Sequence, residues 1–393
     1  MPQVTPNLCY NIRTMNLKRR VWVEVDLGKL KSNYTKIAAA VKPANVLCVM
    51  KANAYGLGVR PYATALASAG CTAFGVAEPF EALELLEALR ETPTDRPPSV
   101  QILSSILPDE IAPMVKAGVI LPVIDLATAK LIDAAAKQLK TVAKVHFKLD
   151  TGMGRLGILA AEAPRVIRQV KRLKHLDCEG IFSHCPMAYD PANEFTNDQI
   201  DLFRTILKDL AKDGITFKTV HIAASDAINN FPRAAKPPFN QVRTGINLHG
   251  SFDPNGRRAL NVESVLTLKT RVAQVRELPA GTTLGYGRTW CLAKKTRVAT
   301  ISAGYADGLP LALTNRGHVL IQGHPCPVIG RISMDYTTVD VTHAPNVKPG
   351  DEVVCLGGTG KYAITPDDWG TLKGTHAYEI ICSFGNRVER VYR

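Results

Sequence analysis

The sequence has no hydrophobic run long enough to cross a membrane, and its first twenty residues are polar and basic rather than apolar. We therefore expect neither a membrane span nor a secretory signal, and we interpret residues 1–20 as an N-terminal extension of a cytoplasmic protein. The nine cysteines form no CxxC pair and no spacing typical of a metal site. This pattern favours reduced thiols over a disulfide framework and predicts no metal.

Basic clusters are also scarce, although the formal net charge of +13 is high. Lysines and arginines alternate with acids along the whole chain, and only Lys18, Arg19 and Arg20 stand together. Proteins that bind nucleic acid usually concentrate their positive charge on one face, so we expect no nucleic-acid partner. A dispersed positive charge is compatible with an anionic small-molecule substrate.

The chain does contain a regular alternation of short apolar runs and amphipathic stretches, and its 393 residues predict two domains. Each apolar run is typical of a buried parallel strand, and helix-like segments separate most of them. The runs are 46–50, 73–77, 100–103, 120–124, 145–149, 180–183, 220–223 and 242–246. They predict an α/β fold, a (β/α)8 TIM-like barrel over residues 21–257. An open doubly wound sheet would give a similar pattern.

The pattern changes after residue 257, where strand-like runs are joined by turns rich in glycine and proline. These runs are 266–278, 296–301, 318–321, 326–329, 337–341 and 352–356. Short helices return only at 366–372 and 375–382. Residues 258–393 are therefore predicted to form a mostly antiparallel β-strand domain.

The stretch 45–58, NVLCVMKANAYGLG, brings a single lysine to the end of the first barrel strand. Ligands bind at this end of barrel strands, so Lys51 is a candidate nucleophile, provided that its pKa is lowered or its amine forms a Schiff base. Taken alone, a polar residue at the end of a strand has an ordinary structural interpretation. Here, however, several of the predicted strands carry a polar residue that could take part in chemistry. The others are Lys148, His184 and Ser225, while Arg243 lies within strand eight and Arg155 lies in the glycine-rich turn after strand five.

Nine segments resemble the signature segments of the alanine racemase family and follow one another in the same order along the chain. The members of that family are fold-type III enzymes that use pyridoxal 5'-phosphate. The nine segments are KANAYGLG (51–58), KLDTGMGRLG (148–157), SHCPMAYD (183–190), HIAAS (221–225), VRTGI (242–246), LGYGRTW (284–290), GYADG (304–308), GRISMD (330–335) and AYEIICSFGNRV (377–388). The resemblance extends from about residue 21 to 393. It implies an isomerase that interconverts L-alanine and D-alanine, supplies D-alanine for peptidoglycan and forms a homodimer with composite active sites.

The resemblance also implies how the cofactor is held. Lys51 would carry it covalently and exchange the Cα proton on one face of the substrate, while Tyr286 of the partner subunit would serve the other face. Arg243 would face the ring nitrogen, which a guanidinium leaves unprotonated, and this favours proton return over transamination or decarboxylation. His184 would link Arg243 to Tyr286 by hydrogen bonds. The phosphate would contact Tyr55, Ser225, Gly245, Ile246 and Tyr378.

On the substrate side, the resemblance assigns the carboxylate to Arg155 and to the backbone around Met334. Tyr305 would line the entrance from the other subunit, and Asp335 would support this region. Lys148 resembles a lysine that is often carbamylated in the family, which would give Arg155 an anionic partner.

Several positions depart from the family pattern and leave the size of the substrate open. They are Cys185, Ala224, Thr244, His249 and Leu309. A racemase for serine or larger amino acids is therefore an alternative. A decarboxylase of the same fold is disfavoured by Arg243. A non-catalytic carrier of the cofactor would resemble the barrel alone and would lack Tyr286.

Overall fold

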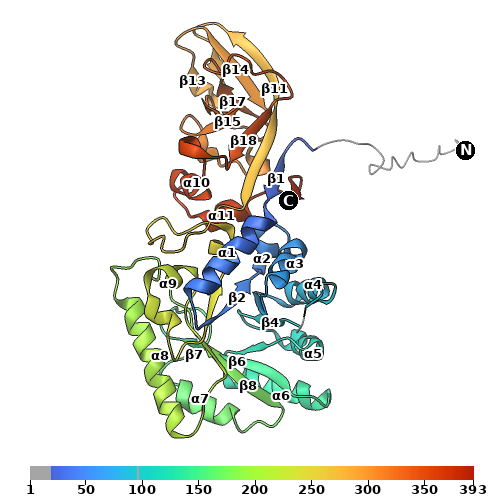
Figure 1. Ribbon diagram of the computed structural model, residues 1–393, viewed down its shortest axis with the longest axis vertical. Helices are drawn as coiled ribbons and strands as arrows, with labels where there is room; N and C mark the ends of the chain where they lie inside the picture. Colours follow the sequence, from blue (N-terminus) through green and yellow to red (C-terminus); the bar gives the residue numbers. More distant parts are fainter. Residues whose placement is uncertain (1–18, 95–96) are drawn as a thin grey trace, which may run out of the picture.

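The computed structural model describes residues 19–94 and 97–393, which form two parts arranged end to end (Figure 1). Most of the expected N-terminal extension, residues 1–18, lies outside the described residues. The lower part in the view is built of alternating strands and helices, and the upper part is rich in β-strands. No helix in the described ranges is long and apolar enough to span a membrane.

Parallel strands of the lower part form a closed ring. Pairing runs through β10-β2-β3-β4 and through β5-β6-β8-β9. A parallel bridge between Gln101 and Ile120 joins β4 to β5, and the Arg243 amide donates to the Ala223 carbonyl at 3.0 Å between β10 and the end of β9. The strands are β2 (Asn45–Val49), β3 (Ala73–Val76), β4 (Ser99–Ile102), β5 (Leu121–Val123), β6 (Ala143–Asp150), β8 (Leu176–Phe182), β9 (Thr219–His221) and β10 (Gln241–Thr244). Closure confirms the barrel and excludes the open sheet.

Helices follow the barrel strands and bury one face each. Asp26 caps α1, which precedes the first barrel strand, because its Oδ1 accepts a hydrogen bond from the Lys29 amide at 2.8 Å. A two-residue strand, β7 (Ile158–Leu159), precedes α7. The helices are α1 (Leu27–Ala40), α2 (Lys51–Tyr55), α3 (Val59–Ser68), α4 (Pro79–Arg90), α5 (Pro108–Ala117), α6 (Leu126–Gln138), α7 (Ala163–Val170), α8 (Phe195–Lys212) and α9 (Ser225–Asn230).

The upper part is a mostly antiparallel sheet, as predicted. The long strand β11 pairs antiparallel with β1, β14 and β18. Its strands are β11 (Leu266–Leu278), β14 (Thr296–Ile301), β15 (His318–Ile321), β16 (His324–Pro327), β17 (Thr337–Asp340) and β18 (Glu352–Leu356), with the separate hairpin β12 (Thr283–Leu284) and β13 (Trp290–Cys291). Two helices, α10 (Pro366–Lys373) and α11 (Ala377–Cys382), complete this part.

One strand joins the two parts in a way that the sequence did not predict. β1 (Trp22–Val25) lies before the barrel in the chain, yet it pairs with β11 on one side and with β19 (Glu389–Tyr392) on the other. Val23 and Val25 are completely buried. The first described strand therefore belongs to the C-terminal sheet, although the sequence assigns residues 21–257 to the barrel.

Candidate active site

Lys51 is the first residue of α2 and follows β2 at the barrel end where the strands finish. The next four residues, Ala52 to Tyr55, all have positive φ angles, between 52° and 60°. A left-handed turn of this kind costs about 1–2 kcal/mol for each L-residue, so it persists only where neighbouring groups hold it. Glu81 does so from α4, because its Oε1 accepts a hydrogen bond from the Ala52 amide at 2.5 Å and its Oε2 accepts one from the Ala77 amide at 2.7 Å.

The C-terminal strand holds the other end of the same turn. Arg390 donates from Nε to the Gly56 carbonyl at 2.9 Å, and the Tyr392 hydroxyl donates to the Leu57 carbonyl at 2.9 Å. These contacts come from β19, more than 300 residues away in the sequence. The lysine is thus presented on a backbone that both parts of the chain fix.

Four cations gather at this end of the barrel without a carboxylate partner. Among residues 19–94 and 97–393, none of Lys51, Lys148, Arg155 and Arg243 forms an ion pair. Burial, together with Arg155, lowers the pKa of Lys51. Burial, followed by Arg155, lowers the pKa of Lys148 to about 8. Lys148 and Arg243 are buried, and positive charge without an ion-pair partner is costly to bury. The arrangement therefore suits an anionic ligand.

Arg243 is buried within β10, and all of its hydrogen-bond partners are uncharged. Nη1 lies 2.7 Å from Nδ1 of His221, and Nη2 donates to the carbonyls of Ser183 at 2.8 Å and Ile222 at 3.0 Å. Burial lowers the pKa of Arg243 to about 10, so the guanidinium remains charged at neutral pH.

His184 follows β8 and contacts Arg243, with 3.3 Å between its Nδ1 and Nη2. Burial, followed by Arg243, lowers the pKa of His184 to about 3. The imidazole is therefore neutral at physiological pH, and Arg243 is the charged member of this pair. The two residues that the resemblance joins in one hydrogen-bonded chain do lie side by side.

Small and hydroxyl-bearing residues form a cradle beside Lys51. A Cβ atom added to Gly245 would overlap the Tyr55 hydroxyl, and the Gly245 amide donates to Ser225 Oγ at 3.2 Å. Tyr378 reaches the same place from α11, with its ring centroid 6.1 Å from that of Tyr55. Ile246 begins the 3-10 turn η3 (Ile246–His249) that follows Gly245. Burial raises the pKa of both phenols above the usual range, which keeps them as hydrogen-bond donors. This donor set fits a phosphate group.

Gly245→Ala should weaken cofactor binding, because its methyl group would displace the Tyr55 hydroxyl from the cradle. We expect at least about a tenfold rise in the dissociation constant, the cost of one displaced hydrogen bond to a charged group. Titration of the apoprotein with pyridoxal phosphate measures it. Gly214→Ala is the control: its added methyl group meets no neighbour, and the strain of its positive φ falls at the turn after α8 and not in the cradle. Unchanged affinity in Gly245→Ala would contradict the assignment of the cradle.

The glycine-rich turn after β6 is fixed by the carboxylate of Asp150. Its Oδ1 accepts hydrogen bonds from the amides of Gly152 at 2.9 Å and Gly154 at 3.1 Å, and its Oδ2 accepts one from the Arg155 amide at 3.2 Å. Lys148 lies two residues before Asp150 in β6, and its Nζ donates to the Leu103 carbonyl at 2.7 Å. The charge of Arg155 is near enough to contribute to the lowered pKa of Lys148.

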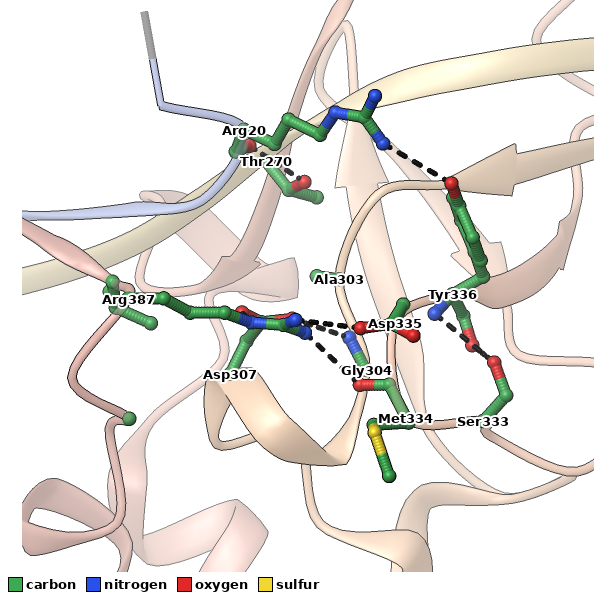
Figure 2. A network of polar contacts seen from close by, with 12 residues as sticks. Arg20, Thr270, Ala303, Gly304, Asp307, Ser333, Met334, Asp335, Tyr336 and Arg387 are labelled. Carbon is green, nitrogen blue, oxygen red and sulfur yellow. Dashed lines mark hydrogen bonds and ion pairs between the residues drawn. The ribbon is translucent and has the colours of Figure 1, made fainter. Parts of the chain in front are cut away.

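Other predicted site residues lie together in the C-terminal part (Figure 2). The Tyr305 amide donates to the Ser333 carbonyl at 3.0 Å, and the Ala306 amide donates to the Met334 carbonyl at 3.2 Å. The loops that carry Tyr305 and Met334 therefore touch directly. Asp335 follows in the second loop.

The end of the basic extension reaches this second loop. Arg20 donates to the Tyr336 hydroxyl at 3.2 Å, and its own carbonyl accepts a hydrogen bond from Thr270 Oγ1 at 3.0 Å (Figure 2). Tyr286 and Tyr336 line one surface pocket with Ser333. Tyr286 is 73% exposed.

The predicted residues thus form two groups that one chain does not bring together. The barrel group surrounds Lys51 and includes Tyr378 from the C-terminal part. Tyr286 lies between β12 and β13, and Figure 1 shows β13 at the far end of the C-terminal part, well away from α2.

Sequence comparison assigns both parts of the chain. Residues 25–253 match the family described as "Alanine racemase, N-terminal domain", and residues 265–392 match "Alanine racemase, C-terminal domain". The chain belongs to the alanine racemase family.

Individual alanine racemases are similar over nearly the whole length. The protein from Halothermothrix orenii is 36% identical over 380 residues, which cover 96% of this chain and 98% of that protein. The solved alanine racemase from Streptomyces coelicolor A3(2) has a TM-score of 0.88 and 30% identity, covering 95% of this chain and 98% of its own. The alanine racemase from Bartonella henselae, solved with covalently bound pyridoxal phosphate, has a TM-score of 0.85 and 29% identity, covering 96% of this chain and all of its own.

Three residues that hold the site residues in place were not predicted from the sequence. Glu81 has no local signal, because an acid in the first turn of a helix is common. His221 lies within HIAAS and contacts Arg243, and its ring stacks on Phe182 with centroids 4.9 Å apart. Arg387 lies within AYEIICSFGNRV and joins the two loops of the C-terminal group. The last two could have been selected because they stand inside quoted segments.

Proposed function

We propose that this protein is a pyridoxal-phosphate-dependent alanine racemase that interconverts L-alanine and D-alanine. The observation that carries the proposal is the group of four cations, Lys51 and three others, which form no ion pair with a carboxylate in the described residues. A phosphorylated cofactor and a substrate carboxylate would supply the missing negative charge.

The cradle residues fit the cofactor, and the cofactor, when bound, supplies an electron sink that makes the Cα proton of the amino acid acidic. Tyr55, Ser225, Gly245, Ile246 and Tyr378 would hold its phosphate through hydroxyls and backbone amides. Lys51 would bind it covalently and, with its lowered pKa, release and accept the Cα proton on one face. Tyr286 of the partner subunit would do so on the other face.

Arg243 supports racemisation over the other reactions of this cofactor. Its guanidinium faces only neutral acceptors and remains charged. A cation at the ring nitrogen disfavours protonation of that nitrogen, which limits charge delocalisation and favours rapid return of the proton to Cα. A decarboxylase or transaminase would gain from an acid at this position.

The separation of the two residue groups supports a homodimer. Tyr286 is largely exposed between β12 and β13, and Figure 1 shows β13 well away from α2, so a second copy would present it to Lys51. We place the enzyme in the cytoplasm, where it would supply D-alanine for peptidoglycan.

Product chirality on a panel of L-amino acids tests the proposed function. The protein loaded with pyridoxal phosphate should convert L-alanine to D-alanine faster than it converts any other amino acid. Comparable rates with serine or larger substrates would instead support the broad-specificity alternative, which the departures at Cys185 and His249 leave open. Formation of an amine and carbon dioxide would contradict a racemase.

Lys148 should take up carbon dioxide as a carbamate. Only the neutral amine reacts, and with a pKa of about 8 roughly a tenth of it is neutral at pH 7 and about half at pH 8. Uptake should therefore rise as pH increases from 7 to 9. A carbamate carbon resonance in protein incubated with 13C-bicarbonate measures it, with Lys148→Arg as the blank. A signal that persists in the variant, or none in the native protein at pH 9, would refute the assignment.

A further inference from the structure

One arginine braces the two loops of the C-terminal group (Figure 2). Arg387 donates from Nε and Nη2 to the two carboxylate oxygens of Asp307, at 2.7 and 2.9 Å. Its Nη1 donates to Asp335 Oδ1 at 2.6 Å, and Nη2 also reaches the Met334 carbonyl at 3.3 Å. Arg387 itself lies in the turn between α11 and β19, so three distant segments meet at a single guanidinium.

The Asp307 carboxylate is the fixed centre of this brace, since its side chain is only 2% exposed. Besides the guanidinium, it accepts a hydrogen bond from the Gly304 amide at 3.0 Å. Gly304 and Asp307 flank Tyr305, so this bond closes the turn η5 (Tyr305–Asp307). The bidentate fork of Arg387 matches a carboxylate in both distance and orientation, and it sets the position of the whole turn.

The two loops are packed too closely to move independently. A Cβ atom added to Gly304 would overlap the carbonyl oxygens of Ser333 and Met334. A Cβ atom added to Gly385 would overlap the Ala306 carbonyl oxygen. The loops and the turn that carries Arg387 therefore form one rigid unit.

Arg387 also changes the local charge. It pairs with two carboxylates, those of Asp307 and Asp335. Both lie within one residue or two of the groups that the proposed function assigns to the substrate, Met334 and Tyr305. Without the guanidinium, two negative charges would face an approaching carboxylate.

We propose that Arg387 is a positioning residue for the substrate carboxylate. It acts without touching the substrate, by fixing the backbone at Met334 and Tyr305 and by neutralising Asp307 and Asp335. This inference rests on the proposed function and adds to it a residue with a stated role. The Arg387 side chain contacts Asp307, Asp335 and Met334, whereas the turn after Lys51 is held by Arg390 through the Gly56 carbonyl. Loss of the Arg387 side chain should therefore weaken substrate binding and leave cofactor binding unchanged.

Kinetics of Arg387→Ala and Arg387→Lys test the role. We expect Arg387→Ala to raise KM for alanine about 10- to 100-fold, the scale for misplacement of a positioned group, with a smaller change in kcat. Arg387→Lys should be intermediate, because an ammonium keeps the charge but not the fork. Arg316→Ala is the matched control, since this guanidinium also joins two segments of the same part, through the carbonyls of Ala312 and Leu372.

A second measurement separates positioning from a merely structural brace. Inhibition by acetate, a bare carboxylate, should weaken in parallel with KM, while the affinity for pyridoxal phosphate stays at the native value. Adding Asp335→Asn to Arg387→Ala should recover part of the loss by removing one repulsive charge. If Arg387→Ala does not fold, the KM for alanine and the acetate inhibition of Arg387→Lys test the role instead.

Unchanged KM and unchanged acetate inhibition in folded Arg387→Lys and Arg387→Ala would overturn the inference. Loss of thermal stability and cofactor affinity without a rise in KM would do so too, because it would show a structural brace only. These outcomes are distinct from failure of the proposed function, in which the native protein itself would not racemise alanine.

Discussion

Lys51→Ala should lower racemisation by about 10⁴-fold or more, the upper range for loss of a positioned proton-transfer group, since it also removes the covalent link to the cofactor. The left-handed turn at Ala52 to Tyr55 and its anchors on Glu81 and Arg390 hold this amine at the barrel end. Lys148, the other lysine that we place at this end of the barrel, is not equivalent, because its amine is hydrogen bonded to the Leu103 carbonyl.

Absorbance provides the measurement for Lys51→Ala. The native protein with pyridoxal phosphate should show an absorbance band at about 420 nm from the covalent bond between Lys51 and the cofactor, and the variant should not. Lys130→Ala, an exposed substitution on α6, should keep both the band and the activity. A Lys51→Ala protein that retains the band and racemises alanine at the native rate would show that another amine carries the cofactor.

Tyr286→Phe should bind the cofactor normally and lose proton exchange on one face only. Removing one hydroxyl leaves the barrel group intact, because Tyr286 lies in the hairpin of the C-terminal part and is exposed in its own chain. We expect racemisation to fall about 10²- to 10⁴-fold, the usual contribution of one positioned acid or base.

Exchange of Cα-deuterium from each enantiomer of alanine in ordinary water measures that loss. One enantiomer should keep exchanging through Lys51 and the other should become nearly inert. Tyr362→Phe, an exposed phenol elsewhere in the same part, is the control. Equal exchange from both enantiomers in Tyr286→Phe would remove this tyrosine from the mechanism.

Much of the fold could be predicted because each barrel strand is a short apolar run beside an amphipathic segment. The choice between a closed barrel and an open sheet could not be made from that pattern. It depends on contacts such as the bridge between Gln101 and Ile120, which are made between strand ends and leave no periodic signal. Residues 22–25 were included in the barrel domain for a similar reason, since the partners of β1 in β11 and β19 lie hundreds of residues along the chain.

The residues of the barrel group could be predicted from the sequence, but the residues that hold them in place could not. Residues such as Ser225 and Arg243 lie at or near the ends of consecutive strands, and parallel strands bring such ends together. The left-handed turn after Lys51 has no sequence signal, because glycine, the residue that normally adopts positive φ, is absent from positions 52–55. Its anchor Glu81 becomes visible only once the chain is folded.

The central claim is that one active site needs Lys51 from one chain and Tyr286 from another. Co-expression of Lys51→Ala and Tyr286→Phe chains with different tags yields mixed dimers whose two sites differ. One site then lacks both groups and the other has both, so the mixed dimer should recover about half the native activity per dimer, although each variant alone is nearly inactive. Mixed dimers as inactive as the separate variants would contradict a composite site.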